Sequence, residues 1–236
     1  MTLPEELCVA TRDAIVARYG LMPALDRDLT SPMSPTPIGK LAVWSGVETV
    51  RKVVYCSMAV PQIGLDSHMV FAFTAPESAV PHFTLDSVEG QGSFAFHLDL
   101  IPRVDLGVSL SYLDGVYEPL TPLYQEVIAR EGLTRANLTP RQYAIMSPWM
   151  LVHRATAEAF AGIGDAVGAY REHWSALVES GVKSDLDGAA LAQRDHIHRS
   201  LLFSVEIDPV WKQTTRLLGE EQSEAVRAQL LHNGVS

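Results

Sequence analysis

Basic residues, cysteines and long apolar runs are all scarce in this chain of 236 residues. Eighteen lysines and arginines stand against 28 aspartates and glutamates, so the formal net charge is −10. A protein that binds nucleic acid needs a basic face for phosphate contacts, and one held on anionic lipid needs clustered cations. We therefore expect neither a nucleic acid nor a membrane as a partner.

The only cysteines are Cys8 and Cys56, in different predicted elements. They provide neither a disulfide framework nor a zinc site, and no histidine spacing supplies a third ligand, so we expect no metal. The amino terminus lacks the basic-then-apolar pattern of a signal peptide, and no apolar run reaches the ~18 residues of a membrane span. These patterns favour a cytoplasmic protein.

The first half of the chain is rich in predicted strands. An amphipathic helix over residues 4–19 ends at Gly20, and a proline-broken loop occupies residues 29–37. Strands are expected at residues 38–44, 47–59, 67–74, 80–86 and 93–100. Because the connections are too short for helical crossovers, the sheet should be mostly antiparallel.

The second half is predicted to be helical, and hydrophobic residues make up 47% of the chain. Helices are expected at residues 110–117, 122–131, 139–145, 156–182, 185–203, 209–218 and 220–231, with a short apolar stretch at 149–153 and an interruption at Gly162 and Gly164. This order indicates a single α/β (α+β) domain over residues 1–236. We expect a three-layer α/β/α sandwich with a central, mostly antiparallel sheet and helices on both faces.

Asp66 is the first candidate for acid/base chemistry. It follows the turn Pro61-Gln-Ile-Gly64 and opens a strand, and His68 lies two residues later, on the same face of a regular strand. The pair could therefore act as a proton donor and its relay. The plainer alternative is a turn aspartate that caps its own backbone.

Three segments carry a family resemblance. The first is Pro61-x-x-Gly64-x-Asp66, the second runs Leu-Asp-Leu-Ile-Pro-Arg-Val-Asp over residues 98–105, and the third runs Ser-Pro-Trp-Met-Leu-Val-His-Arg over residues 147–154. In this order, over roughly residues 45–225, the chain resembles the ferredoxin-dependent bilin reductases and red chlorophyll catabolite reductase. On the strand where one bilin reductase has a histidine, Tyr55 or Cys56 stands here.

The resemblance implies an enzyme that reduces an open-chain tetrapyrrole, such as biliverdin or a chlorophyll catabolite. Electrons would come from reduced ferredoxin, with no bound flavin or metal, and the protein would be a monomer or a homodimer. The implied proton donors are Asp66 and Asp195, with His68 as relay. A carboxyl group can donate near neutral pH only if its pKa is raised.

The substrate would be held by arginines and aromatic residues. Bidentate guanidinium groups suit the two propionates of a bilin, and the candidates are Arg154 and Arg103, followed by Arg199. Trp149, Tyr55 and His198 complete the predicted contacts. Each arginine could instead belong to a surface salt bridge, and Asp195, His198 and Arg199 could form an ordinary charged helix stripe.

Two other functions remain open at this stage. One is a protein that binds a tetrapyrrole without converting it, and the other is an enzyme that acts on a different conjugated small molecule. Since plant-type ferredoxins are acidic, docking one needs a local basic surface. Lys40, Arg51 and Lys52 are predicted to supply it at the sheet edge.

Overall fold

The computed structural model describes residues 1–235, and its centre is one eight-stranded sheet in the order β1-β2-β3-β4-β5-β6-β8-β7. Every neighbouring pair of strands is antiparallel, as predicted. The strands are β1 Met22–Leu29, β2 Gly39–Ser45, β3 Val50–Val60, β4 Leu65–Thr74, β5 His82–Gly90, β6 Ser93–Ile101, β7 Leu133–Arg135 and β8 Leu151–Ala155.

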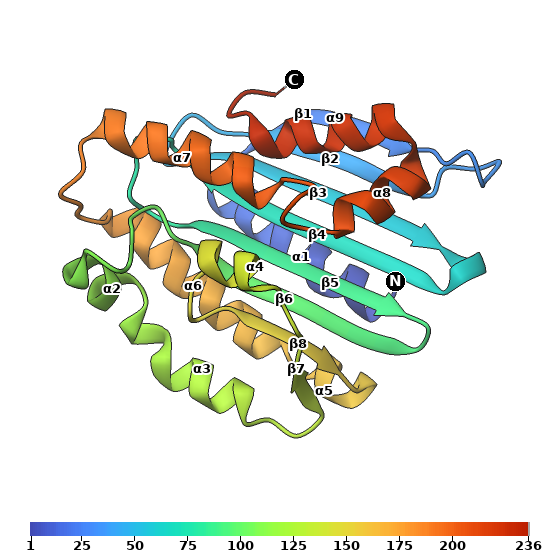
Figure 1. Cartoon of the computed structure of the whole chain (residues 1–236), viewed down its shortest axis with the longest axis horizontal. Coiled ribbons are helices and arrows are strands. Elements are labelled where there is room, and N and C mark those ends of the chain that lie inside the picture. Colours follow the sequence, from blue (N-terminus) through green and yellow to red (C-terminus); the bar gives the residue numbers. More distant parts are fainter. Residues whose placement is uncertain (236) are drawn as a thin grey trace.

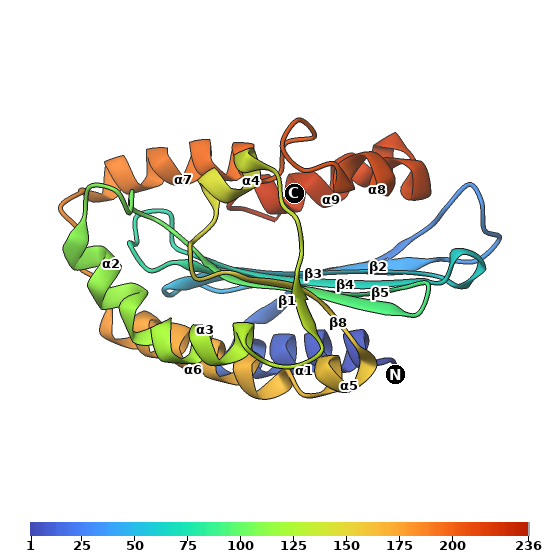
Figure 2. The same ribbon diagram turned by 60° about the horizontal axis from the view of Figure 1, so that its bottom comes forward.

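Helices cover both faces of this sheet (Figures 1 and 2). One layer contains α1 Leu3–Arg18, α2 Leu110–Val116, α3 Thr121–Ile128, α5 Ala157–Ala161 and α6 Gly164–Ser180. The other contains α4 Pro140–Ile145, α7 Gly188–Leu202, α8 Val210–Leu218 and α9 Glu220–Leu231. The predicted three-layer sandwich is confirmed. Among residues 1–235, no helix combines the length and apolar composition needed to cross a bilayer.

Alternate residues of each strand enter two separate cores, as the strand pleat requires. Tyr55 and Val70 belong to the core beneath α1 and α6, whereas Cys56 and Phe71 belong to the core beneath α7, α8 and α9. The α6 side is anchored by Trp174, which is fully buried and donates its indole N–H to the carbonyl of Pro81 at 2.8 Å.

Three strands differ from the sequence-based expectations. Strand β1 was missed because six of its eight residues are exposed, so it shows no apolar alternation. The three residues of β7 are too few to carry a pattern, and the apolar stretch near residue 150 forms β8. The interruption expected at Gly162 and Gly164 is confirmed, because the helical segment at 156–182 is divided into α5 and α6 around Gly162 and Ile163.

The β5–β6 hairpin has a two-residue turn that fixes how the residues of β5 and β6 pair. Gln91 and Gly92 both have positive φ angles, of 52° and 78°, which is the geometry of a type I′ turn. The strands therefore pair from Gly90 with Ser93, and this register places Asp86 directly opposite His97.

Gly39 of β2 lies where the backbone of β3 leaves no room for a side chain. A Cβ atom on Gly39 would lie 1.9 Å from the carbonyl oxygen of Ser57, whereas one on Gly90 would meet no heavy atom within 4 Å. We expect Gly39→Ala to lower the free energy of unfolding by about 2 kcal/mol or more, because the β2–β3 pairing must shift. Gly90→Ala is the control, and equal urea midpoints for the two variants would contradict this packing.

Candidate active site

A cavity of about 300 Å³ lies between the sheet and the layer that contains α4, α7, α8 and α9. Its walls are mostly apolar: Met69 and Phe71 project from β4, Phe203 follows α7, and Trp211 belongs to α8. Cys56 of β3 also lines it, and burial raises the pKa of its thiol to about 12, so the sulfur is a neutral thiol. This is the type of site that binds a largely apolar small molecule.

Besides Cys56, three ionisable side chains line this apolar cavity. Asp86 of β5 and His97 of β6 are opposite each other, and Nδ1 of His97 lies 3.2 Å from a carboxylate oxygen of Asp86. Asp208, in the loop before α8, accepts a hydrogen bond from the amide of Val210 at 3.0 Å. The Nε2 atom of His97 is buried and has no hydrogen-bond partner within the part of the chain that the structure describes.

The environment shifts the pKa values of two of these groups in a direction that favours proton donation. Burial alone would lower the pKa of His97, but the hydrogen bond to Asp86 and the charges of Asp86, Asp99 and Asp208 outweigh it, so the pKa lies above 6.5. Burial and the nearby Asp86 raise the pKa of Asp208. A carboxyl group and an imidazolium that remain protonated nearer neutral pH are suited to general acid catalysis.

A second concavity, of about 1010 Å³, continues from the first toward the strand ends and contains two arginines. Strand β8 lines both of them. Its residue Val152 faces the cavity, and Arg154, two residues further along the strand, faces the continuation. Arg216 of α8 lines the continuation with Arg154. Its lining, within the described chain, contains no aspartate or glutamate, so this region can bind a ligand's carboxylates.

Asp66, His68 and Tyr55 come together, but on the opposite face of the sheet. Nε2 of His68 lies 3.0 Å from a carboxylate oxygen of Asp66, its Nδ1 lies 2.7 Å from the Tyr55 hydroxyl, and Thr2 donates to Asp66. The pairing of Asp66 with His68 is as predicted. However, α1 packs on this face, with the Cys8 thiol 3.6 Å from the His68 carbonyl oxygen. None of the three side chains lines the cavity.

Asp195, Arg103 and Arg199 form a buried ion cluster at the other end of the sheet. Asp195 accepts a hydrogen bond from His82 at 2.8 Å, and each guanidinium lies 3.6 Å from one of its carboxylate oxygens. Although burial opposes ionisation, His82 and the two arginines lower the pKa of Asp195. A carboxylate held in this state is a poor proton donor. The three side chains are thus bound to one another, and the proton-donor role of Asp195 and the substrate-binding roles of Arg103 and Arg199 stay predictions.

Two further predicted contacts lie away from the cavity. Trp149 stacks on Tyr117, with ring centroids 5.4 Å apart, and donates its indole N–H to Thr121 at 2.8 Å. It therefore packs in the α6 layer and forms no wall of the cavity. His198 donates through Nε2 to the carbonyl of Ile145 at 2.7 Å and lines a neighbouring groove.

The predicted basic patch of Lys40, Arg51 and Lys52 does not form. Lys40 is paired with Asp26 at 2.8 Å, and Arg51 donates to the carbonyl of Val47. Lys52 is only 1% exposed and donates to the carbonyl of Gly234 at 3.0 Å. Burial lowers its pKa to about 7, so it provides no exposed charge for a partner.

The sequence analysis did not assign Asp86, His97, Asp208 or Arg216 to the site. The Gly90-Gln-Gly92 turn held the relevant signal, because a two-residue turn sets the register that pairs Asp86 with His97. No pattern marks Asp208 and Arg216, because they reach the site only through the packing of α8 on the sheet.

The Asp86–His97 pair makes a testable contribution to stability. A folded-state pKa above 6.5 means that the pair stabilises the protein fully below the unfolded value, and that this stabilisation is lost as the pH rises through the folded value. We expect Asp86→Asn to lower the His97 pKa in an NMR titration and to cost more stability at about pH 6 than at about pH 9. Glu6→Gln, on exposed α1 surface, is the control. An unchanged His97 pKa in Asp86→Asn would contradict the pairing.

The buried ion cluster leads to a second prediction. Asp195→Asn leaves Arg103 and Arg199 without a compensating charge, so we expect the free energy of unfolding to fall by about 3 kcal/mol in urea. Asp185→Asn, in the exposed loop before α7, should change it by less than about 0.5 kcal/mol. If Asp195→Asn were fully stable but inactive, the predicted proton-donor role would replace the structural one.

Comparisons with known proteins give a likeness in fold. No protein-family model matches the chain, and no curated protein matches it in sequence. Among solved structures, it is similar to that of phytochromobilin synthase from tomato in complex with biliverdin. The TM-score is 0.78 at 21% sequence identity, and the match covers 98% of this chain and 83% of the tomato chain. The chain therefore shares the fold of a protein whose structure was determined with a bound open-chain tetrapyrrole.

Proposed function

We propose that this protein is a reductase of an open-chain tetrapyrrole, with reduced ferredoxin as the external electron donor. The likeness in fold to phytochromobilin synthase in complex with biliverdin supports the choice of substrate. The observation that carries the proposal is the apolar cavity under α7 and α8, in which Asp86, His97 and Asp208 are the ionisable side chains.

The cavity suits a flat conjugated ligand that must be protonated while it is reduced. Reduction of one double bond consumes two electrons and two protons. Protonation makes the conjugated system a better electron acceptor, because the added electron then neutralises a positive charge. The apolar walls exclude water, so protons reach the ligand from the side chains that face it.

His97 and Asp208 are the proton donors in this proposal, and Asp86 supports both. His97 gives one proton, and Asp86 stabilises its imidazolium form through the 3.2 Å contact. Asp208 gives the other, since burial and the charge of Asp86 favour its neutral form. The two sources belong to different layers, the sheet and the loop before α8, so they can deliver protons to different positions along the ligand.

The arginine-lined continuation is assigned to the propionates of the substrate. Arg154 was predicted from the sequence for this role, and Arg216 faces the same concavity from α8. A planar guanidinium binds a carboxylate through two parallel hydrogen bonds. With the propionates at this end, the conjugated rings extend toward Asp86 and His97 between β4 and α8.

The predicted roles of Asp66 and His68 as donor and relay remain to be tested against this assignment. Both side chains lie beneath α1, so they could act only on a ligand bound at that face. We therefore propose that they position the amino-terminal helix through the hydrogen bond between Asp66 and Thr2.

The deciding experiment compares Asp86→Asn, Asp208→Asn and Asp66→Asn in anaerobic assays with biliverdin and reduced ferredoxin. We expect the first two variants to lose roughly 10²–10⁴-fold in kcat, because Asp86→Asn removes the group that keeps the general acid His97 protonated and Asp208→Asn removes a general acid itself. Biliverdin should still change its absorbance on binding to them. Asp66→Asn should retain activity within about threefold of the unsubstituted protein, because its side chain does not reach the cavity.

Each alternative function has its own outcome. Loss of turnover in Asp66→Asn alone would restore the prediction made from the sequence. Binding of biliverdin without turnover by the unsubstituted protein would support a tetrapyrrole carrier. Absence of any absorbance change would support an enzyme with a different conjugated substrate.

A further inference from the structure

One part of the surface departs from the acidic character of the chain. Residues 133–155 contain three arginines and no aspartate or glutamate. They include β7 and β8, at one edge of the sheet, and α4 between these two strands in the chain. In the neighbouring helix α7 the only carboxylate is Asp195, which is 2% exposed and bound within the buried ion cluster. The outer surface of α4 and α7 therefore carries no exposed acid in a chain with a net charge of −10.

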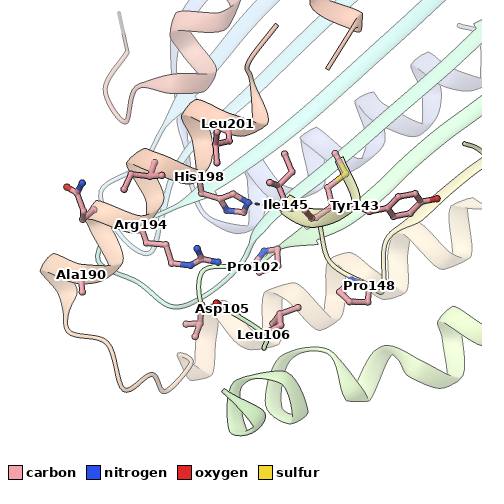
Figure 3. A pocket seen from close by; sticks show the side chains of 15 residues that line it. Pro102, Asp105, Leu106, Tyr143, Ile145, Pro148, Ala190, Arg194, His198 and Leu201 are labelled. Atoms are coloured by element: carbon pink, nitrogen blue, oxygen red, sulfur yellow. Dashed lines mark hydrogen bonds between the residues drawn. The ribbon is translucent and has the colours of Figure 1, made fainter. Parts of the chain in front are cut away.

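A groove of about 690 Å³ crosses this surface between α7, α4 and the segment after β6 (Figure 3). Its apolar side chains are unusually accessible: Ile197 is 49% exposed, Leu201 41% and Tyr143 39%. Apolar side chains exposed side by side are typical of interaction surfaces. Asp105 is the one carboxylate that lines the groove in the described chain, and it already accepts a hydrogen bond from the amide of Gly107.

Within the described chain, two arginines at the groove have no carboxylate ion-pair partner. Arg194 lines it and donates through Nε to the carbonyl of Arg103 at 3.0 Å, and Arg135 lies over the Tyr143 ring at 5.3 Å. Across residues 1–235, neither they nor Arg141 takes part in an ion pair. Cations on the opposite layer differ: Arg18 is paired with Glu172 and Glu179, and Arg130 with Glu126 and Asp165. The charges of these arginines are thus not neutralised by ion pairs, and the Asp105 carboxylate is the one negative charge in the groove's described lining.

The groove is also close to the substrate cavity. Met146, which follows α4, lines both, and His198 and Leu202 of α7 face the groove and the cavity respectively. Only the thickness of one helix layer, about 10 Å, separates the two. A redox centre brought to the groove would therefore be near the conjugated ligand assigned to the cavity.

We propose that this groove and its arginine rim are the docking surface for an acidic protein that carries a one-electron redox centre. The inference rests on the proposed function, which needs an external reductant, and it replaces the surface predicted around Lys40. Each encounter oxidises one donor centre and adds one electron to the ligand, so each reduced double bond needs two encounters along with its two protons. A polar rim around a small apolar centre favours fast, reversible association, as this turnover requires.

The test measures donor binding directly, with a plant-type [2Fe–2S] ferredoxin as the probe. The variants are Arg135→Glu and Ile197→Asp. The Arg135 side chain is exposed and forms no ion pair within the described chain, and Ile197 lines the groove. Arg27→Glu on β1 is the control, because it makes the same change in net charge on another exposed strand. We expect the Kd for ferredoxin to rise about tenfold in the first two variants and by less than about twofold in the control. The affinity should fall with added salt.

Turnover and substrate binding separate this inference from the proposed function. In Arg135→Glu the KM for ferredoxin should rise, while kcat at saturating ferredoxin and the Kd for biliverdin stay unchanged. Equal ferredoxin affinities for Arg135→Glu, Ile197→Asp and Arg27→Glu, or no ferredoxin binding by the unsubstituted protein, would overturn the docking surface. In a third outcome, ferredoxin binds and its binding is weakened by Arg135→Glu, while biliverdin is not reduced. That outcome would support the docking surface and contradict the proposed function.

Discussion

The pleat of the central strands decides which side chains can act together in this protein. Because successive residues of β4 point to opposite faces, Asp66 and His68 are committed to the layer of α1, while Ser67 and Met69 are committed to the layer of α8. The same rule separates Tyr55 from Cys56 on β3. A change of one residue in register would exchange the two sets. The short turn between β5 and β6 prevents such a change where it matters, at Asp86 and His97.

The second constraint is the buried ion cluster around Asp195, which links α7 to the sheet. Arg103 follows the end of β6 and His82 is the first residue of β5, and the side chains of both contact the carboxylate of Asp195 on α7. Arg199 extends the cluster to the carboxyl-terminal segment through the carbonyl of Leu230. A buried charge without its partners is expensive, so this end of the helix layer is held in one position. The helix layer that covers the cavity is attached to the sheet at this end.

Ion pairing of the arginines differs from place to place on the surface. On the α1 and α6 side, arginines are neutralised by nearby carboxylates, as Arg18 and Arg130 show. On the cavity side, Arg154 and Arg216 face a concavity with no acid in its described lining, and Arg135 and Arg194 border the groove. Arg227 of α9, in the same layer, is paired with Glu224 at 2.6 Å. An acidic protein can thus carry a local positive region, which a net charge alone does not reveal.

The sequence by itself determined the fold class, the antiparallel sheet and most helices, because apolar periodicity and glycine or proline breaks are local properties. It also marked the Asp66–His68 pair as sharing a face, since this follows from strand geometry. It did not place that face beneath α1, nor did it bring Asp208 and Arg216 toward Asp86 and His97. These outcomes depend on contacts between residues more than a hundred positions apart along the chain, for example Asp86 and Asp208. Only tertiary packing decides them, because which helix covers which face of the sheet is settled by the summed burial of both cores.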